Sequence, residues 1–136
     1  MKSKELIPLL SACFTTWLPG AKGVSTNTIT SYQYAFRLLF EFMSEVKGIP
    51  TGKVTFSDLA NGTITEYLAW LEQARKCSAT TRNRRRAAIA SFANYAIKKA
   101  FNESLAFYTE VTGVPVKKLR KETTGSIFLK RRYPVC

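Results

Sequence analysis

The densest chemical feature of the sequence is a basic and polar run that begins at Ser78 and reads SATTRNRRRAAIASFANYA. No acidic residue lies between Glu72 and Glu103. The same stretch contains Arg75, Lys76, Arg82, Arg84, Arg85, Arg86, Lys98 and Lys99. Solvated faces usually mix the two signs of charge, so a block of one sign favours a binding surface. Guanidinium groups bind phosphate well, because their N–H donors match its oxygens. This run therefore predicts contact with phosphate groups.

The charge of the whole chain points to the same class of partner. The 136 residues include 21 basic and 9 acidic side chains, which gives a formal net charge of +12. A second basic block runs from Lys117 to Arg132 and contains only Glu122 as an acid. Such an excess favours a polyanion, although ribosomal and membrane-surface proteins share it. A hydrophobic content of 46% is enough for a folded core.

Other kinds of chemistry have little support in the sequence. There is no histidine, and Cys13, Cys77 and Cys136 form no CxxC pair, so we expect neither a metal site nor a cofactor, and free thiols in the cytoplasm. Tyr133 lies in a basic tail without catalytic partners, and we expect no enzymatic activity from this chain alone. The apolar run that starts at Leu6 is interrupted by Pro8, so we expect no contact with a membrane.

Apolar residues at spacings of three and four predict helices that would position these polar groups. The first covers roughly residues 4–18 and is expected to stop at Pro19-Gly20. The second follows Ser25 and ends at Gly48, and the third opens with a capping-box pattern at Thr63 and extends to about residue 75. The fourth starts at Ser78, and a short fifth covers about 103–112. Residues 53–56 could pair briefly as a strand. The fold class is therefore all-α, an orthogonal bundle of four main helices plus a short fifth helix.

Two polar helix faces result from this arrangement. The outward side of the fourth helix contains Thr80, Asn83, Arg84, Ala87, Ser91, Asn94 and Lys98. Arg82, Arg85 and Arg86 lie on its core side, in the first turns, where we expect them to extend past the edge of the core and clamp phosphates. The outward side of the second helix offers Asn27, Thr30, Ser31 and Tyr34, with Arg37 beside them. Its second half is acidic, so DNA is expected at the amino-terminal halves of both helices, where the helix dipole favours phosphate. Ser25 and Ser78 are equally explained as helix caps.

These segments also resemble the start of tyrosine recombinases of the phage-integrase type. The stretch FTTWLPGAKGVSTNTITSYQYAFRLLFEFM resembles the family's Leu-Pro helix end, followed by a "Ser-x-x-Thr-Ile-x-x-Tyr" second helix at Ser25, Thr28, Ile29 and Tyr32. The fourth helix matches at Thr81, Arg82, Asn83, Arg85, Ile89, Ser91 and Phe92, and TGVPVKK resembles the approach to the interdomain linker. Arg86 departs from the pattern, since the family usually has an apolar residue there.

The resemblance implies a core-binding, SAM-like domain whose second and fourth helices face the DNA groove. It implies a domain over residues 1–116, a basic linker or tail over 117–136, and the absence of the family's catalytic domain with its His-x-x-Arg motif and tyrosine. The expected partners are double-stranded DNA and, on DNA, other recombinase protomers, and the chain is expected to be monomeric when free. The expected DNA-binding residues are Lys22, Asn27, Thr30, Ser31, Tyr34, Arg37, Thr80, Arg82, Asn83, Arg84, Arg85, Arg86, Ser91, Lys117 and Lys118.

Two other functions fit parts of the sequence. A helix-turn-helix-like transcription regulator would need a dimer and a tight turn before its recognition helix, and the Lys76-Cys77 connection is compatible with such a turn. A basic module that binds protein or RNA would use Leu38 and Phe42, which lie towards the outward side of the second helix. Gel filtration and competition between duplex DNA and RNA separate these functions.

Overall fold

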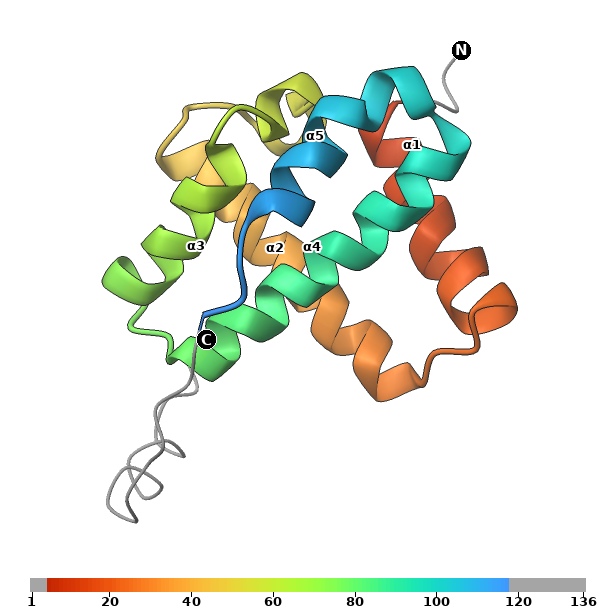
Figure 1. Cartoon of the computed structure of the whole chain (residues 1–136), viewed down its shortest axis with the longest axis horizontal. Helices are drawn as coiled ribbons and strands as arrows, with labels where there is room; N and C mark the ends of the chain where they lie inside the picture. The colour runs from red at the N-terminus through yellow and green to blue at the C-terminus, as the bar shows by residue number, and fades with distance from the viewer. Residues whose placement is uncertain (1–4, 118–136) are drawn as a thin grey trace.

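The computed structural model describes residues 5–117, and these residues form helices without any strand. The helices are α1 (Leu6–Ala12), the π-helix η2 (Cys13–Ala21), α2 (Thr26–Glu45), α3 (Thr63–Ala74), α4 (Ala79–Lys99) and α5 (Phe101–Gly113). Two 3-10 turns, η3 (Thr51–Lys53) and η4 (Ser57–Leu59), flank residues 54–56, and the strand suggested for residues 53–56 does not form. In Figure 1, α2 and α4 cross at the centre, α1 and α3 lie on opposite sides, and α5 packs on α4. The prediction of an all-α bundle is confirmed.

The two crossing helices begin with the same side-chain cap. The Ser25 Oγ accepts a hydrogen bond from the backbone N–H of Thr28 at 3.2 Å. The Ser78 Oγ accepts one from the N–H of Thr81, also at 3.2 Å. Each cap satisfies a backbone donor that has no partner inside its helix. Both predicted helix starts are therefore confirmed.

Residues with positive φ end several of the helices. Gly48 has a φ of 72° and turns the chain after α2, so that the N–H of Ile49 donates to the carbonyl of Met43 at 3.0 Å. Lys76 has a φ of 60° and turns the chain after α3, although residues with side chains rarely adopt a positive φ. The N–H of Cys77 then donates to the carbonyl of Leu71 at 3.0 Å. The predicted end of the second helix at Gly48 is confirmed.

The predicted stop at Pro19 is wrong. The helical chain continues through Pro19 to Ala21 as a π-helix, and it turns only at Gly23, which has a φ of 69°. Proline removes an N–H donor and crowds the preceding turn of an α-helix. The wider i→i+5 turn, seen in the bond from Lys22 N–H to the Trp17 carbonyl at 2.8 Å, accommodates it.

The predicted capping box of the third helix is also wrong. The residue before the helix is Gly62, which has a φ of 92°, and no side chain of its own segment caps α3. The carboxylate of Glu110, from α5, lies there instead. It accepts from the backbone N–H groups of Gly62 at 2.6 Å, Ile64 at 3.0 Å and Thr65 at 3.3 Å. The start of α3 is therefore satisfied by a residue distant in the sequence, and Glu66 pairs with Lys47 instead.

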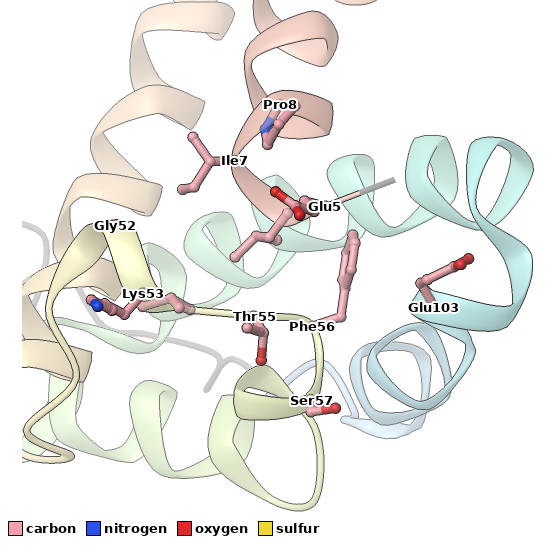
Figure 2. A pocket seen from close by; sticks show the side chains of 11 residues that line it. Glu5, Ile7, Pro8, Gly52, Lys53, Thr55, Phe56, Ser57 and Glu103 are labelled. Atoms are coloured by element: carbon pink, nitrogen blue, oxygen red, sulfur yellow. The ribbon is translucent and has the colours of Figure 1, made fainter. Parts of the chain in front are cut away.

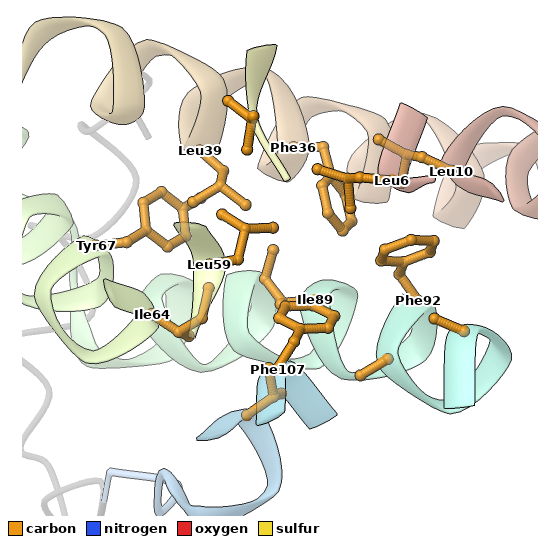
Figure 3. Close-up of a cluster of buried hydrophobic side chains, with 14 of the residues drawn as sticks. Leu6, Leu10, Phe36, Leu39, Leu59, Ile64, Tyr67, Ile89, Phe92 and Phe107 are labelled. Carbon is orange, nitrogen blue, oxygen red and sulfur yellow. The ribbon is translucent and has the colours of Figure 1, made fainter. Parts of the chain in front are cut away.

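Phe92 of α4 is central to the aromatic part of the core (Figure 3). Its ring centroid lies 5.6 Å from that of Phe36, 6.0 Å from Phe56 and 5.9 Å from Phe107. These contacts tie α4 to α2, to the loop before η4 and to α5. Leu38 and Phe42 are also buried, and the Phe42 ring packs against Trp70 of α3 at 5.4 Å. The expectation that Leu38 and Phe42 are available to a helical partner is wrong, because this bundle itself covers them.

Cys13 is a free, fully buried thiol, whereas Cys77 is not a free thiol, so the expectation of free thiols is wrong at Cys77. Burial raises the pKa of Cys13 to about 12. The folded pKa therefore exceeds the unfolded one, and the contribution of the protonated thiol to stability is present below pH 9 and is lost as the pH rises towards 12.

We expect a thiol reagent at pH 8 to leave Cys13 unmodified in the native protein and to modify it after denaturation. Peptide mapping by mass spectrometry checks this, and rapid native labelling would contradict it.

Candidate nucleic-acid interface

The amino-terminal halves of α2 and α4 lie on the same side of the crossing of the two helices (Figure 1). Between them is an open hollow of about 330 Å³. It is lined by Asn27, Thr28, Ser31 and Tyr32 of α2 and by Arg84 and Ala87 of α4. The structure therefore brings together three of the residues expected to bind DNA: Asn27, Ser31 and Arg84.

Arg84 is the exposed cation of this hollow. Its side chain faces solvent, and it makes no salt bridge within residues 5–117. Small or polar side chains surround it, so a bulky ligand can approach closely. Its guanidinium can donate hydrogen bonds in a fixed fork, which suits phosphate oxygens and the acceptors of a guanine edge.

Tyr34 and Arg85 join the two helices close to the core. The Arg85 guanidinium lies 5.0 Å from the centroid of the Tyr34 ring, which is a cation–π contact between α2 and α4. Arg85 is only 8% exposed, and burial lowers the pKa of its guanidinium. The expectation that Arg85 extends past the edge of the core is wrong, because its side chain packs between the helices.

Arg82 and Arg86 have backbone carbonyls as partners. The Nη1 of Arg82 donates to the carbonyl of Pro115 at 2.9 Å, and the Nε of Arg86 donates to that of Val114 at 2.7 Å. Arg82 is 9% exposed, so it too does not extend past the core edge as expected. Both guanidinium groups are therefore hydrogen-bonded to the chain just after α5.

Asn83 and Lys117 contact each other. The Asn83 side chain accepts from the Lys117 N–H at 2.9 Å and donates to the Lys117 carbonyl at 3.0 Å. The Lys117 ammonium also pairs with both carboxylate oxygens of Glu72, each at 2.9 Å. Lys118 lies outside the described residues.

The remaining expected residues lie around the hollow or away from it. Thr30 is exposed, and Thr80 and Ser91 are partly exposed. Lys22 is held 5.5 Å over the Trp17 ring, at the end of η2. Arg37 lines a different groove, between α1, η2 and α2, and so it is not part of the hollow.

Sequence reasoning missed Thr28 and Tyr32 as lining residues. Both are named from the sequence only as positions of the pattern that resembles the family, and not as DNA contacts. The spacing of Asn27, Thr28, Ser31 and Tyr32 is i, i+1, i+4 and i+5, which is one broad face of a helix. That spacing was the available signal.

The ion pairs of the described residues gather around α3. Glu41 pairs with Arg75 at the end of α3, Glu66 of α3 pairs with Lys47, and Glu72 of α3 pairs with Lys117. The face of α4 that contains Arg84 has no acidic residue. The hollow is therefore a cationic region whose charge is not cancelled locally.

Residues 5–117 contain no group of histidine, cysteine or acidic side chains arranged to hold a metal ion. None of their helices combines the length and the apolar character that crossing a bilayer requires.

The fold defines an all-helical domain with a basic hollow between two crossing helices. Comparison with known proteins identifies its family. Residues 12–100 match the model of the phage integrase N-terminal SAM-like domain. The chain belongs to this family.

Two proteins of Sinorhizobium fredii (strain NBRC 101917 / NGR234) are similar to it. The one named "Putative integrase/recombinase y4rC" is 32% identical over 122 residues, which is 88% of this chain and 36% of that protein. The one named "Putative integrase/recombinase y4rD" is 29% identical over 119 residues, or 88% of this chain and 42% of that protein. The chain thus spans about two-fifths of the length of these relatives. No solved structure matches significantly.

Proposed function

We propose that this chain binds double-stranded DNA through the amino-terminal halves of α2 and α4, as the DNA-binding part of a tyrosine recombinase. The observation that carries the proposal is the hollow to which both helices contribute, with Arg84 exposed beside Asn27 and Ser31. The family membership supports a role related to recombination.

The side chains of the hollow suit a duplex. Asn27, Ser31 and Arg84 offer hydrogen-bond donors to phosphates and to base edges. Ala87 adds no bulk, so the backbone of α4 can come close to DNA. The major groove is roughly 12 Å wide and admits an α-helix. The proposed contact surface also includes Thr30, Thr80, Ser91 and Lys22. The other polar residues of α4 lie behind this surface and hold its helices and the chain after α5 in place: Arg82, Asn83, Arg85 and Arg86.

Strand cleavage and rejoining are not proposed for this chain. The names of the two relatives describe an integrase/recombinase, and the chain spans 36% and 42% of their lengths. A sequence without histidine has no His-x-x-Arg motif, which the resemblance implies for the chemical step. We propose that the chain supplies DNA contact and that it is monomeric when free.

The test is the salt dependence of binding to a fluorescent 30-base-pair duplex, measured by anisotropy. If about five phosphates are neutralised, log K falls with log salt with a slope of about −4.5. Arg84→Ala should make this slope less steep by about 0.9 and weaken binding about tenfold, because one phosphate contact is lost. The matched control is Lys53→Ala, which removes the same charge from η3, where Lys53 lines a different pocket (Figure 2).

Four outcomes would contradict the proposal. Binding that does not change with salt would remove the electrostatic premise. Equal losses for Arg84→Ala and Lys53→Ala would mean that net charge matters and the hollow does not. Stronger competition by RNA than by duplex DNA would favour the RNA-binding alternative, and a dimer in gel filtration would favour the transcription regulator.

A further inference from the structure

Three polar side chains in the first turns of α4, those of Arg82, Asn83 and Arg86, hold the residues Val114–Lys117, here called the exit segment. Arg82 donates to the carbonyl of Pro115, Arg86 to that of Val114, and Asn83 bonds to both the N–H and the carbonyl of Lys117. A second bond from Arg86, at 3.5 Å, goes to the carbonyl of Val111 in the last turn of α5. Side chains of α4 thus bind the backbone of the exit segment at Val114, Pro115 and Lys117.

These side chains bind backbone carbonyls that have no partner within a helix. Val114 is extended, with φ −81° and ψ 121°, so α5 has ended and the carbonyls that follow lack helical partners. Pro115 has no N–H to donate. The side chains of Arg82, Asn83 and Arg86 supply donors to these carbonyls. Asn83 pairs with Lys117 in both directions, as one residue of a β-ladder would.

The direction of these side chains on α4 separates them from the hollow. Each residue of an α-helix rotates by about 100°. Arg84 therefore points about 200° away from Arg82, whereas Arg86 lies about 40° from Arg82 on the same side. One side of the first turns of α4 faces the hollow, and the other holds the exit segment. The Lys117 ammonium on Glu72 of α3 fixes the far end of the segment.

We propose that Arg82, Asn83 and Arg86 are positioning residues that fix where, and in which direction, the chain leaves this domain relative to α4. The inference rests on the proposed function, because α4 is also the helix proposed to enter the DNA groove. Whatever follows Lys117 then starts from a fixed point on the DNA-contacting helix. These three side chains act on the chain and do not contact phosphates.

The first experiment measures the exit segment in the full-length protein without DNA. Amide exchange at Lys117 should be slow, because its N–H donates to Asn83. Asn83→Ala should speed this exchange about tenfold, since a net hydrogen bond is worth about one such factor. The backbone order parameter of Val116 should fall from about 0.85 towards 0.6. Asn94→Ala, the same substitution at an exposed position of α4, should change neither value.

The second experiment separates positioning from phosphate contact. Arg86→Gln should loosen the exit segment in the same exchange measurement and leave the salt slope of DNA binding unchanged. Arg84→Ala should do the reverse. An Asn83→Ala variant whose Lys117 amide exchanges at the wild-type rate would overturn the proposal. So would a salt slope that is less steep by about 0.9 in Arg86→Gln, because that guanidinium would then contact a phosphate in the wild type. A wild-type protein without salt-dependent binding refutes the proposed function, and the exchange data still decide whether α4 holds the exit segment.

Discussion

Phe92→Ala is expected to lower the free energy of unfolding by about 3–5 kcal/mol, which is the largest loss we predict for a single substitution. The ring of Phe92 is buried against Phe36, Phe56 and Phe107. Removing it leaves a cavity where α4, α2, α5 and the loop before η4 meet. Because small domains are stable by only about 5–15 kcal/mol, this loss is a large share of the total. Urea unfolding followed by circular dichroism measures it.

Phe101→Ala is the matched control, because it removes the same ring from a position that is 57% exposed. Its expected cost is about 0.5 kcal/mol or less. Phe92→Leu keeps much of the buried volume and should cost clearly less than Phe92→Ala. Similar losses for Phe92→Ala and Phe101→Ala would contradict this account of the core.

Glu110→Ala is expected to cost about 1–3 kcal/mol, because it removes a carboxylate that accepts three backbone N–H groups at the start of α3. The loss should be local as well as global. The amides of Ile64 and Thr65 should exchange faster, while those in the middle of α4 should change only with the overall stability. Hydrogen exchange followed by NMR and chemical unfolding measure the two effects.

Two variants test the cause of this effect. Glu103→Ala removes a carboxylate from an exposed position of the same helix and should cost little. Glu110→Gln keeps one acceptor oxygen but loses the charge that favours a helix amino terminus, so its cost should be intermediate. If Glu103→Ala and Glu110→Ala cost the same, the carboxylate at the start of α3 does not stabilise it.

Local chemistry in the sequence predicted the helices that form the hollow. Ser25 and Ser78 each stand just before a helix and cap it, and Gly48 supplies the positive φ that ends α2. These signals lie within four residues of the feature they determine. The polar face of α2 at Asn27 and Ser31 and that of α4 at Arg84 follow from the same helical period. That these faces meet depends on the crossing of α2 and α4, which the sequence suggested through a family resemblance.

The incorrect predictions concern partners that are distant in the sequence. Thr63 and Glu66 have the spacing of a capping box, but Glu110 caps α3 from 45 or more residues away. The helical wheel correctly placed Arg82 and Arg86 on the inner side of α4. It could not show that the chain after α5 returns to that side and offers its carbonyls to both. Pro19 failed as a stop signal because a wider helical turn was available to it.

The grouping of ion pairs around α3 has a consequence at distances beyond any contact. Among the described residues, the acids near α3 cancel the neighbouring cations, whereas Arg84 on α4 keeps its full charge. A cation without an ion pair keeps its attraction for a polyanion at separations longer than a hydrogen bond. Added salt should weaken this long-range attraction first, because it shortens the screening length.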